Sequence, residues 1–315
     1  MFKNLLNRLK PASSNAATSS DDTVSAEKLI AEGDRLEASG DLARAGELYR
    51  EAVAAAPGYA RTHLNLGVLL AAQGDSEGAV ASYEAVLAID PHHPFGNYNY
   101  GRLLYLRGDL TRALTLLREA LEARPEFPQA LVLLASVLDD LGETEEAVDV
   151  SLSALGLQPD NPGIWLNHGI MQRKLGRLDD AEEAVRRVLD IDPRDVNALG
   201  LLSYVLRDHG MATEALEPLR AAIASGPDNL ALRSDELLLL NFEEGLAASD
   251  LFARHMEFGK RVEALAPARF DRYPGKQDAK RRIRVGYVSG DFRIHPVTLF
   301  MLPVLEHHDL SLIHI

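Results

Sequence analysis

The chain contains no cysteine in its 315 residues. This absence excludes disulfide bonds, thiolate zinc sites and cysteine nucleophiles, and it fits a reducing compartment. No apolar run approaches the roughly 18 residues of a membrane-spanning helix, and the N-terminus lacks the apolar core and cleavage site of a signal peptide. We therefore expect a cytoplasmic protein without a transmembrane segment.

Basic residues are also scarce. The 33 Lys and Arg residues are outnumbered by 47 Asp and Glu residues, which gives a formal charge of −14. A broad nucleic-acid-binding surface needs clustered Lys and Arg to displace the counterions of phosphates. We therefore expect no nucleic acid as a partner. Apolar residues make up 46% of the chain, which is enough for a substantial folded core.

The first 25 residues differ from the rest of the chain. The opening MFKNLLNRLK carries four large apolar residues at helical spacing among three basic ones. It could lie on an acidic membrane surface, or it could be a short, frayed or locally docked helix, which the marginal stability of isolated short helices favours. Residues 11–25, PASSNAATSSDDTVS, are small and polar. We expect residues 1–25 to form a flexible N-terminal segment.

A period of 34 residues governs the next two-thirds of the chain. Three residue types recur at this step: proline at Pro57, Pro91, Pro125, Pro159, Pro193 and Pro227; glycine at Gly40, Gly74, Gly108, Gly142, Gly176 and Gly210; alanine at Ala45, Ala79, Ala113, Ala147, Ala181 and Ala215. The glycines follow apolar-periodic segments and several precede an acidic residue, as in Gly74-Asp75 and Gly108-Asp109, so they predict a left-handed turn between two helices. The alanines predict close helix approach, as do Gly33, Gly67, Gly101 and Gly169, and the prolines predict the connector that closes each unit.

This pattern resembles the tetratricopeptide repeat family, whose small and large residues are matched by Leu66-Gly67, Tyr83 and Pro91, and by Trp165, Gly169, Ala181 and Pro193. The resemblance implies six repeats over residues 26–229. It also implies a right-handed superhelix of helix pairs, with a concave groove that is lined by the first helix of each pair and binds peptides or proteins.

Asparagine recurs two residues before the first-helix glycine position, at Asn65, Asn99 and Asn167, with Leu133 and Leu201 interrupting the series. A row of side-chain amides can pair with the backbone of an extended peptide whatever its sequence, because each amide offers a donor and an acceptor. Asparagine also tolerates a solvated helix face, and spacing alone favours neither interpretation. The histidine pair His92-His93 follows Pro91 in a connector, where we expect it to be solvated.

The repeat ends after Pro227. Residues 230–266 are expected to form capping helices, with an amphipathic helix over Ala248 to Leu265, and residues 267–282 form a linker rich in proline and basic residues. From Ile283 the sequence IRVGYVSGDFRIHPV predicts a buried strand over 283–289, a turn at Gly290 and Asp291, and a helix that starts after His295-Pro296. The chain is therefore expected to be mainly α, with the first βα unit of a Rossmann-like lobe over residues 283–315.

The repeats, the segment SDELLLLNFEEGLAASDLFARH, and then RRIRVGYVSGDFRIHPV and PVLEHHD resemble, in this order, the protein O-GlcNAc transferases, in particular the Spindly-like members. The resemblance implies a two-lobed GT-B glycosyltransferase that moves N-acetylglucosamine from UDP-GlcNAc to Ser or Thr hydroxyls of acceptor proteins without a metal ion. It implies that Asn65, Asn99 and Asn167 contact the acceptor backbone, and that the catalytic region is incomplete here, so that this fragment alone is inactive.

The resemblance also implies that His295, in the pattern begun by Asp291 and Phe292, is an active-site histidine. Such an imidazole could accept a hydroxyl proton or orient acceptor and sugar. A histidine that only caps a helix is the alternative for this residue. Some relatives carry another histidine where Leu299 stands, which leaves sugar contacts open. A different function also remains open for the whole chain, namely that of a non-catalytic repeat scaffold for protein–protein interaction.

Overall fold

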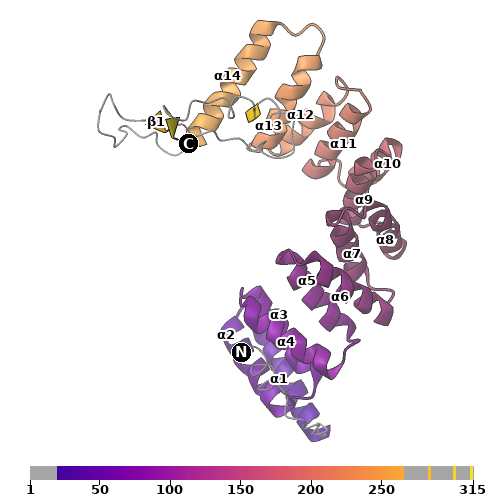
Figure 1. The fold of residues 1–315 in the computed structure, drawn as a ribbon, viewed down its shortest axis with the longest axis vertical. Coiled ribbons are helices and arrows are strands. Elements are labelled where there is room, and N and C mark those ends of the chain that lie inside the picture. The colour runs from indigo at the N-terminus through magenta and orange to yellow at the C-terminus, as the bar shows by residue number, and fades with distance from the viewer. Residues whose placement is uncertain (1–19, 266–282, 285–300, 303–312, 315) are drawn as a thin grey trace. The chain divides into compact units, whose positions relative to one another are not determined.

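The computed structural model of the chain describes residues 20–265, 283–284, 301–302 and 313–314. It divides into two compact units, Met1–Lys260 and Arg261–Ile315. The described part of the first unit is built from helices joined by short turns (Figure 1). The described part of the second unit contains the end of one helix, a helical dipeptide and two short strands.

The helices of the first unit form antiparallel pairs with a first and a second member. The first helices are α1 (Ser20–Ala38), α3 (Ala60–Ala72), α5 (Pro94–Leu106), α7 (Pro128–Asp140), α9 (Pro162–Lys174) and α11 (Val196–Asp208). The second helices are α2 (Leu42–Ala55), α4 (Ser76–Ile89), α6 (Leu110–Ala123), α8 (Thr144–Leu157), α10 (Leu178–Ile191) and α12 (Leu216–Ser225). Each first helix packs along the second helix that follows it, and each second helix contacts the next first helix. The 34-residue period therefore corresponds to one helix pair.

The turn inside each pair has the backbone that the glycine series predicts. Gly40, Gly74, Gly108, Gly142, Gly176 and Gly210 all have φ between +72° and +88°, a left-handed conformation that a Cβ atom disfavours. The acidic residue after the glycine often begins the second helix. The Asp75 side chain accepts a hydrogen bond from Gly78 N at 3.0 Å, whereas Glu143 caps α8 without a side-chain bond.

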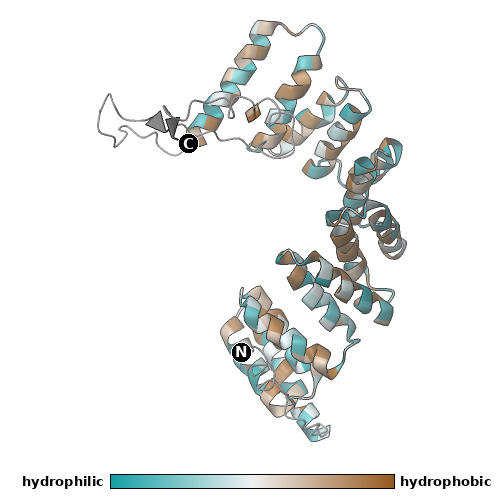
Figure 2. Ribbon diagram, viewed as in Figure 1, coloured by the Kyte–Doolittle hydropathy of each residue, from teal (hydrophilic) through white to brown (hydrophobic). Residues whose placement is uncertain are grey.

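Small residues allow the paired helices to approach. The recurring alanines are fully buried at all six positions. Figure 2 shows hydrophobic and hydrophilic residues alternating along the helices of the array. Two large apolar clusters result, one running from α3 to α9 and the other from α10 to the residues after α12. The core is thus distributed along the array, as expected for a protein in which each repeat packs only on its neighbours.

The N-terminal boundary differs from the expectation. Helix α1 begins at Ser20, so residues 20–25 are helical and do not belong to a flexible segment. Asp21 and Asp22 lie in its first turn, where carboxylates interact favourably with the positive end of the helix dipole. Small polar residues are typical of flexible segments, so the composition did not indicate that a helix begins at Ser20. Residues 1–19, including MFKNLLNRLK, lie outside the described part of the chain.

Beyond the six pairs come α13 (Leu230–Leu239), the 3-10 helix η3 (Leu240–Phe242) and α14 (Ala248–Leu265). The bounds of α14 are those predicted from the sequence. In the second unit, β1 (Ile283–Arg284) pairs in parallel with β2 (Ile313–His314), with Ile283 opposite Ile313. Met301–Leu302 is helical. The rest of the predicted βα unit, including His295, lies outside the described residues.

Candidate functional site

The first helices form one continuous face of the array. Each contacts the next first helix along the chain, from α1 through α11, whereas no two second helices in the described part of the chain make a comparable contact. Polar side chains bridge successive first helices: Tyr105 Oη lies 2.9 Å from Asp140 Oδ2, and Lys174 Nζ lies 2.5 Å from Asp139 Oδ2. We call this surface the first-helix face. The predicted row of Asn65, Asn99 and Asn167, which we call the asparagine ladder, lies on this side.

The three ladder asparagines have different partners. Asn65 Nδ2 donates to Asp34 Oδ1 of α1 at 3.1 Å, and Asn99 Nδ2 donates to the Phe95 carbonyl of its own helix at 2.8 Å. Asn167 is exposed and makes no hydrogen bond to any residue that the structure describes. The Oδ1 atoms of Asn65 and Asn99 likewise have no described partner, so each amide keeps an acceptor available. Of the interrupting positions, Leu133 is half-buried and Leu201 is buried.

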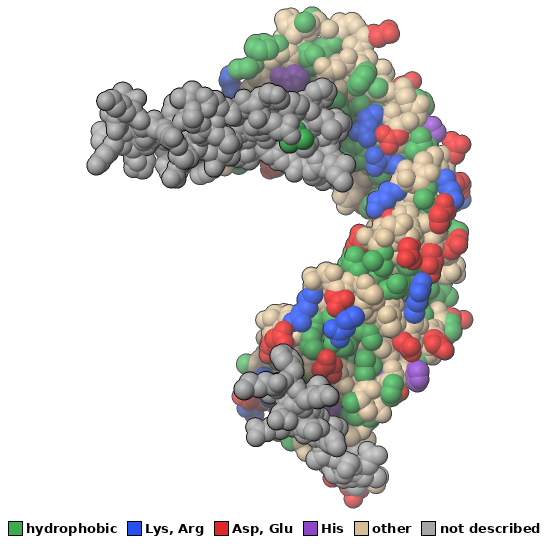
Figure 3. Space-filling model, in the orientation of Figure 1, with side chains coloured by type: hydrophobic (Ala, Val, Ile, Leu, Met, Phe, Trp, Pro, Cys, Tyr) green, Lys and Arg blue, Asp and Glu red, His purple; other side chains and the backbone are tan. Residues whose placement is uncertain are grey.

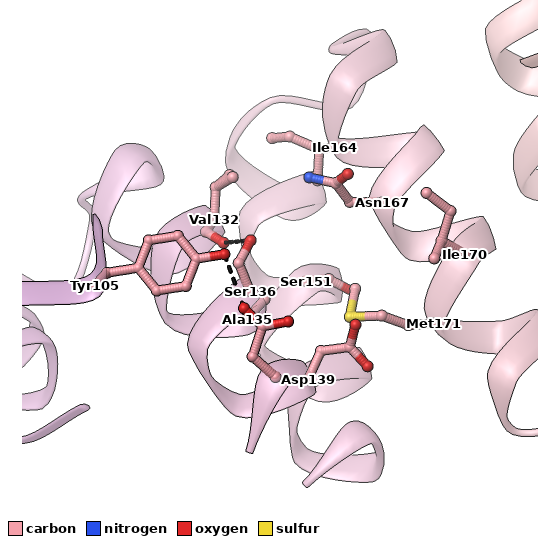
Figure 4. A pocket seen from close by; sticks show the side chains of 11 residues that line it. Tyr105, Val132, Ala135, Ser136, Asp139, Ser151, Ile164, Asn167, Ile170 and Met171 are labelled. Atoms are coloured by element: carbon pink, nitrogen blue, oxygen red, sulfur yellow. Dashed lines mark hydrogen bonds between the residues drawn. The ribbon is translucent and has the colours of Figure 1, made fainter. Parts of the chain in front are cut away.

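A cavity of about 210 Å³ opens on this face between α5, α7 and α9. Its apolar walls come from Val132, Ala135, Ile164, Ile170 and Met171. Its polar lining comes from Tyr105, Ser136, Asp139, Asp140, Ser151 and Asn167. Figure 4 shows Tyr105 approaching from α5 and Asn167 and Ile170 from α9, on the opposite side. The cavity thus adjoins one member of the asparagine ladder, a feature that spacing in the sequence did not indicate.

The cavity carries negative charge. Burial raises the pKa of the Tyr105 phenol, and the hydrogen bond to Asp140 and the charges of Asp140 and Asp139 raise this pKa further. Lys174 compensates the charge of Asp139, which also accepts a hydrogen bond from Thr144 at 3.0 Å. Asp140, by contrast, accepts only from the neutral Tyr105 among the described residues.

A buried serine–histidine pair lies behind the cavity. Ser151 Oγ is 2.6 Å from His168 Nδ1 and also donates to the Val148 carbonyl at 2.7 Å. Because the single hydroxyl proton is used there, Nδ1–H of His168 donates to Ser151, and Nε2 accepts from Gln172 Nε2 at 3.2 Å. Burial lowers the pKa of His168, although the charge of Asp180 raises it slightly. His168 is therefore a neutral core residue and does not deprotonate Ser151.

Charged side chains continue along the first-helix face. Arg173 Nε donates to Asp208 Oδ2 at 2.7 Å, Arg207 also bonds Asp208, and both guanidinium groups lie over the Tyr204 ring. Burial opposes ionisation of Asp208, but the hydrogen bonds from the two arginines outweigh it and lower the pKa of this carboxyl. Burial and a bond to Asp235 raise the pKa of Tyr204 to about 12. In Figure 3, acidic and basic side chains are interspersed along the helical array.

His93 does not behave as expected for a solvated loop residue. Its Nδ1 atom accepts a hydrogen bond from Gly96 N at 3.1 Å and so caps α5, whereas the exposed neighbour His92 pairs with Glu119. Aspartate and serine are the usual capping residues, so the sequence did not indicate that His93 caps a helix.

The structure does not place every predicted site residue. His295 lies outside the described ranges. Within residues 20–265 and the short described segments that follow, no group of His, Asp and Glu side chains could hold a metal ion. No helix among these residues is long and apolar enough to span a bilayer.

The chain is similar to several known proteins. It is 35% identical over 86 residues to a protein from Arabidopsis thaliana named "Probable UDP-N-acetylglucosamine–peptide N-acetylglucosaminyltransferase SPINDLY", and 34% identical over 85 residues to its namesake in Oryza sativa subsp. japonica. Each match covers 27% of this chain and only 9% of the length of the plant protein.

Solved structures resemble the fold over a larger part of the chain. YrrB, described as a tetratricopeptide repeat protein with an unusual peptide-binding site, has a TM-score of 0.54 at 23% identity and covers 59% of this chain and 96% of its own. PilF of Pseudomonas aeruginosa has a TM-score of 0.61 at 18% identity and covers 71% and 100% of the two chains. The family model for the tetratricopeptide repeat matches residues 30–94, 98–162 and 166–229, more than half of the chain. With the helix pairs and the 34-residue period, this match shows that the chain belongs to the tetratricopeptide repeat family.

Proposed function

We propose that the first-helix face binds an extended polypeptide through its backbone. The observation that carries this proposal is the row of exposed or half-exposed asparagines, Asn65, Asn99 and Asn167, on first helices of a repeat array whose fold is suited to protein–protein interaction. Each side-chain oxygen is without a described partner and can accept from a peptide N–H group. Recognition of this kind is independent of peptide sequence, because every residue except proline offers the same donor.

The internal bonds of two ladder residues support the proposal. Asp34 holds the nitrogen of Asn65, and the Phe95 carbonyl holds the nitrogen of Asn99. Each amide is thereby held by its nitrogen, while its oxygen has no partner among the described residues. An oriented acceptor loses less side-chain entropy on binding than a free one.

The ladder is tested by replacing Asn65, Asn99 and Asn167 with alanine together. Peptides selected from a random display library on the intact chain supply the probes. Three lost hydrogen bonds at about 1 kcal/mol each give an affinity loss of about a hundredfold if all three form, and about tenfold if half of that energy is realised. The loss should be similar for unrelated peptides, measured by fluorescence anisotropy, with circular dichroism unchanged.

The control is Ser153→Ala, which removes an exposed polar side chain from the second helix α8, which is not part of the first-helix face. It should leave affinity unchanged. A triple variant that binds every selected peptide as well as the parent chain contradicts the role of the ladder. Failure to select any peptide contradicts the binding function itself.

We further propose that the bound polypeptide is the acceptor in a protein O-GlcNAc transferase reaction. The similarity to the SPINDLY proteins and the parallel pairing of β1 with β2, which is typical of a βαβ connection, support this. In such a reaction the acceptor hydroxyl oxygen bonds to the anomeric carbon of GlcNAc, the bond from that carbon to the diphosphate of UDP breaks, and UDP leaves. The hydroxyl proton goes to a base, and we assign His295 to the active site as its acceptor or as a group that orients the acceptor.

The transferase proposal has a separate test. The full-length gene product, incubated with labelled UDP-GlcNAc, should transfer label to protein without added metal ion, and His295→Ala should lower the rate strongly. Unchanged turnover in this variant would remove His295 from the chemistry. If the parent product transfers no label but still binds peptides, the chain is a repeat scaffold for protein–protein interaction and not part of a transferase.

A further inference from the structure

We infer that the cavity between α5, α7 and α9 binds a basic side chain, Lys or Arg, of the polypeptide that lies on the first-helix face. The inference rests on the proposed peptide-binding function and adds a side-chain preference to it. Three observations carry it: the position of the cavity beside the asparagine ladder, its apolar walls and its uncompensated carboxylate.

The position links the cavity to a bound backbone. Asn167 belongs to the ladder and also lines the cavity, and Ile164 and Ile170 from the same helix line it as well. A peptide unit held by the Asn167 amide therefore lies at the cavity mouth. Since side chains of an extended peptide alternate, a residue next to that unit directs its side chain toward α7 and α9.

The walls suit a long aliphatic stem. Val132 and Ala135 of α7 and Ile164, Ile170 and Met171 of α9 line the cavity, which has a volume of about 210 Å³ (Figure 4). Lys and Arg bury three or four methylene groups against such surfaces while they keep their charged end at a polar rim. Met171 adds an unbranched, polarizable side chain that adapts to an inserted group.

The charge selects a cation. No Lys or Arg side chain lines the cavity, and two carboxylates do. Lys174 compensates Asp139 at 2.5 Å, which leaves Asp140 with only the Tyr105 hydroxyl, at 2.9 Å, among the described residues. The Tyr105 ring beside this carboxylate offers a second attraction for a cation.

The equivalent aspartate two repeats later shows what is missing at Asp140. Asp208 stands at the same position of its repeat, 68 residues further along, and accepts hydrogen bonds from both Arg173 and Arg207. No arginine of the described chain donates such hydrogen bonds to Asp140. A basic residue of a bound peptide would donate them.

Selection from a random peptide library on the intact chain tests the inference, with Asp140→Asn as the variant. Asparagine keeps an acceptor for the Tyr105 hydroxyl, so the helix packing is preserved. Asp149→Asn is the matched control, because it makes the same charge change in the same repeat on an exposed position of the second helix α8. The parent chain and the control should enrich Lys or Arg at one fixed peptide position, and Asp140→Asn should not.

Affinities then give the magnitude. A selected peptide should lose about fivefold in affinity when its basic residue is replaced by norleucine, which keeps the stem and removes the charge, and this loss should vanish in Asp140→Asn. The loss should also shrink at high salt. Selected peptides without a preferred basic position, or a norleucine effect that persists in Asp140→Asn, overturn the inference while leaving peptide binding intact. Failure to select any peptide overturns both proposals.

Discussion

Gly67 of α3 lies against the ring of Tyr83 in α4, so closely that a Cβ atom added to the glycine would stand 2.7 Å from Tyr83 Cε1. Tyr83 is fully buried, so its ring is surrounded by other residues. The same relationship joins Gly33 to Tyr49, 34 residues earlier in the chain. A small residue on one helix and a large one on its partner thus set the distance between the two helices of a pair.

Gly67→Ala should therefore destabilise the protein by about 1–3 kcal/mol, because the added methyl group overpacks a buried ring. Gly156→Ala is the matched control: Gly156 is also helical, and a Cβ there would meet nothing within 4 Å. This control should be neutral or stabilise by up to about 1 kcal/mol through its helix propensity. Urea unfolding of the two variants measures the difference, and equal midpoints would contradict the packing account.

Tyr83 and Tyr49 occupy the same repeat position but differ in hydrogen bonding. Tyr49 Oη donates to Asp34 at 2.7 Å or to Glu37 at 2.8 Å, whereas the buried Tyr83 Oη has no partner, and burial raises the pKa of Tyr83 to about 12. Tyr83→Phe should thus be neutral or stabilising, and Tyr49→Phe should cost about 1.5–3 kcal/mol because its bonds are to charged groups. Chemical denaturation checks both, and a larger loss for Tyr83→Phe would refute the assignment.

The N-cap of α4 gives a prediction with an internal comparison. Asp75→Ala removes the bond to Gly78 N and should cost about 1 kcal/mol. Glu143→Ala, at the corresponding position before α8, removes no such bond and should change stability by less than about 0.5 kcal/mol. Thermal unfolding of both variants is the measurement, and the ranking of the two matters more than either value.

The stability of the chain should fall in mild acid partly because of His168. Burial lowers the pKa of His168 in the folded chain below its ordinary value of 6.5, so the unfolded chain binds this proton more tightly. The contribution of His168 is complete above 6.5 and is lost as the pH falls from 6.5 through the folded pKa. Urea midpoints measured between about pH 8 and pH 5 should therefore decrease toward the acid end.

His168→Asn should flatten this dependence while lowering stability at every pH. Urea midpoints of the parent chain, measured under the same conditions, are the reference for this slope. If the parent chain and His168→Asn lose stability with the same slope between these pH values, His168 is not responsible.

The fold of the repeats was largely predictable because its signals are local and repeated. A glycine with positive φ, such as Gly74, and a buried alanine, such as Ala79, are needed wherever two helices turn and touch, so the same residue types return every 34 positions. The bounds of α14 followed from its amphipathic spacing. The start of α1 at Ser20 did not, because helix propensity alone does not separate a polar helix start from a linker.

The candidate site was predictable only in part. The sequence by itself determined that Asn65, Asn99 and Asn167 share one register of the first helices, because equal spacing in a repeat places residues on the same face. Only the tertiary structure decided that Asp34 and the Phe95 carbonyl engage two of these amides, that Asn167 borders a cavity, and that Asp140 lacks the arginines that Asp208 has. The bond of Asn99 lies within α5 and depends on the rotamer that packing allows. The other features depend on side chains from neighbouring repeats, roughly 30 residues apart, and a period along the chain records neither.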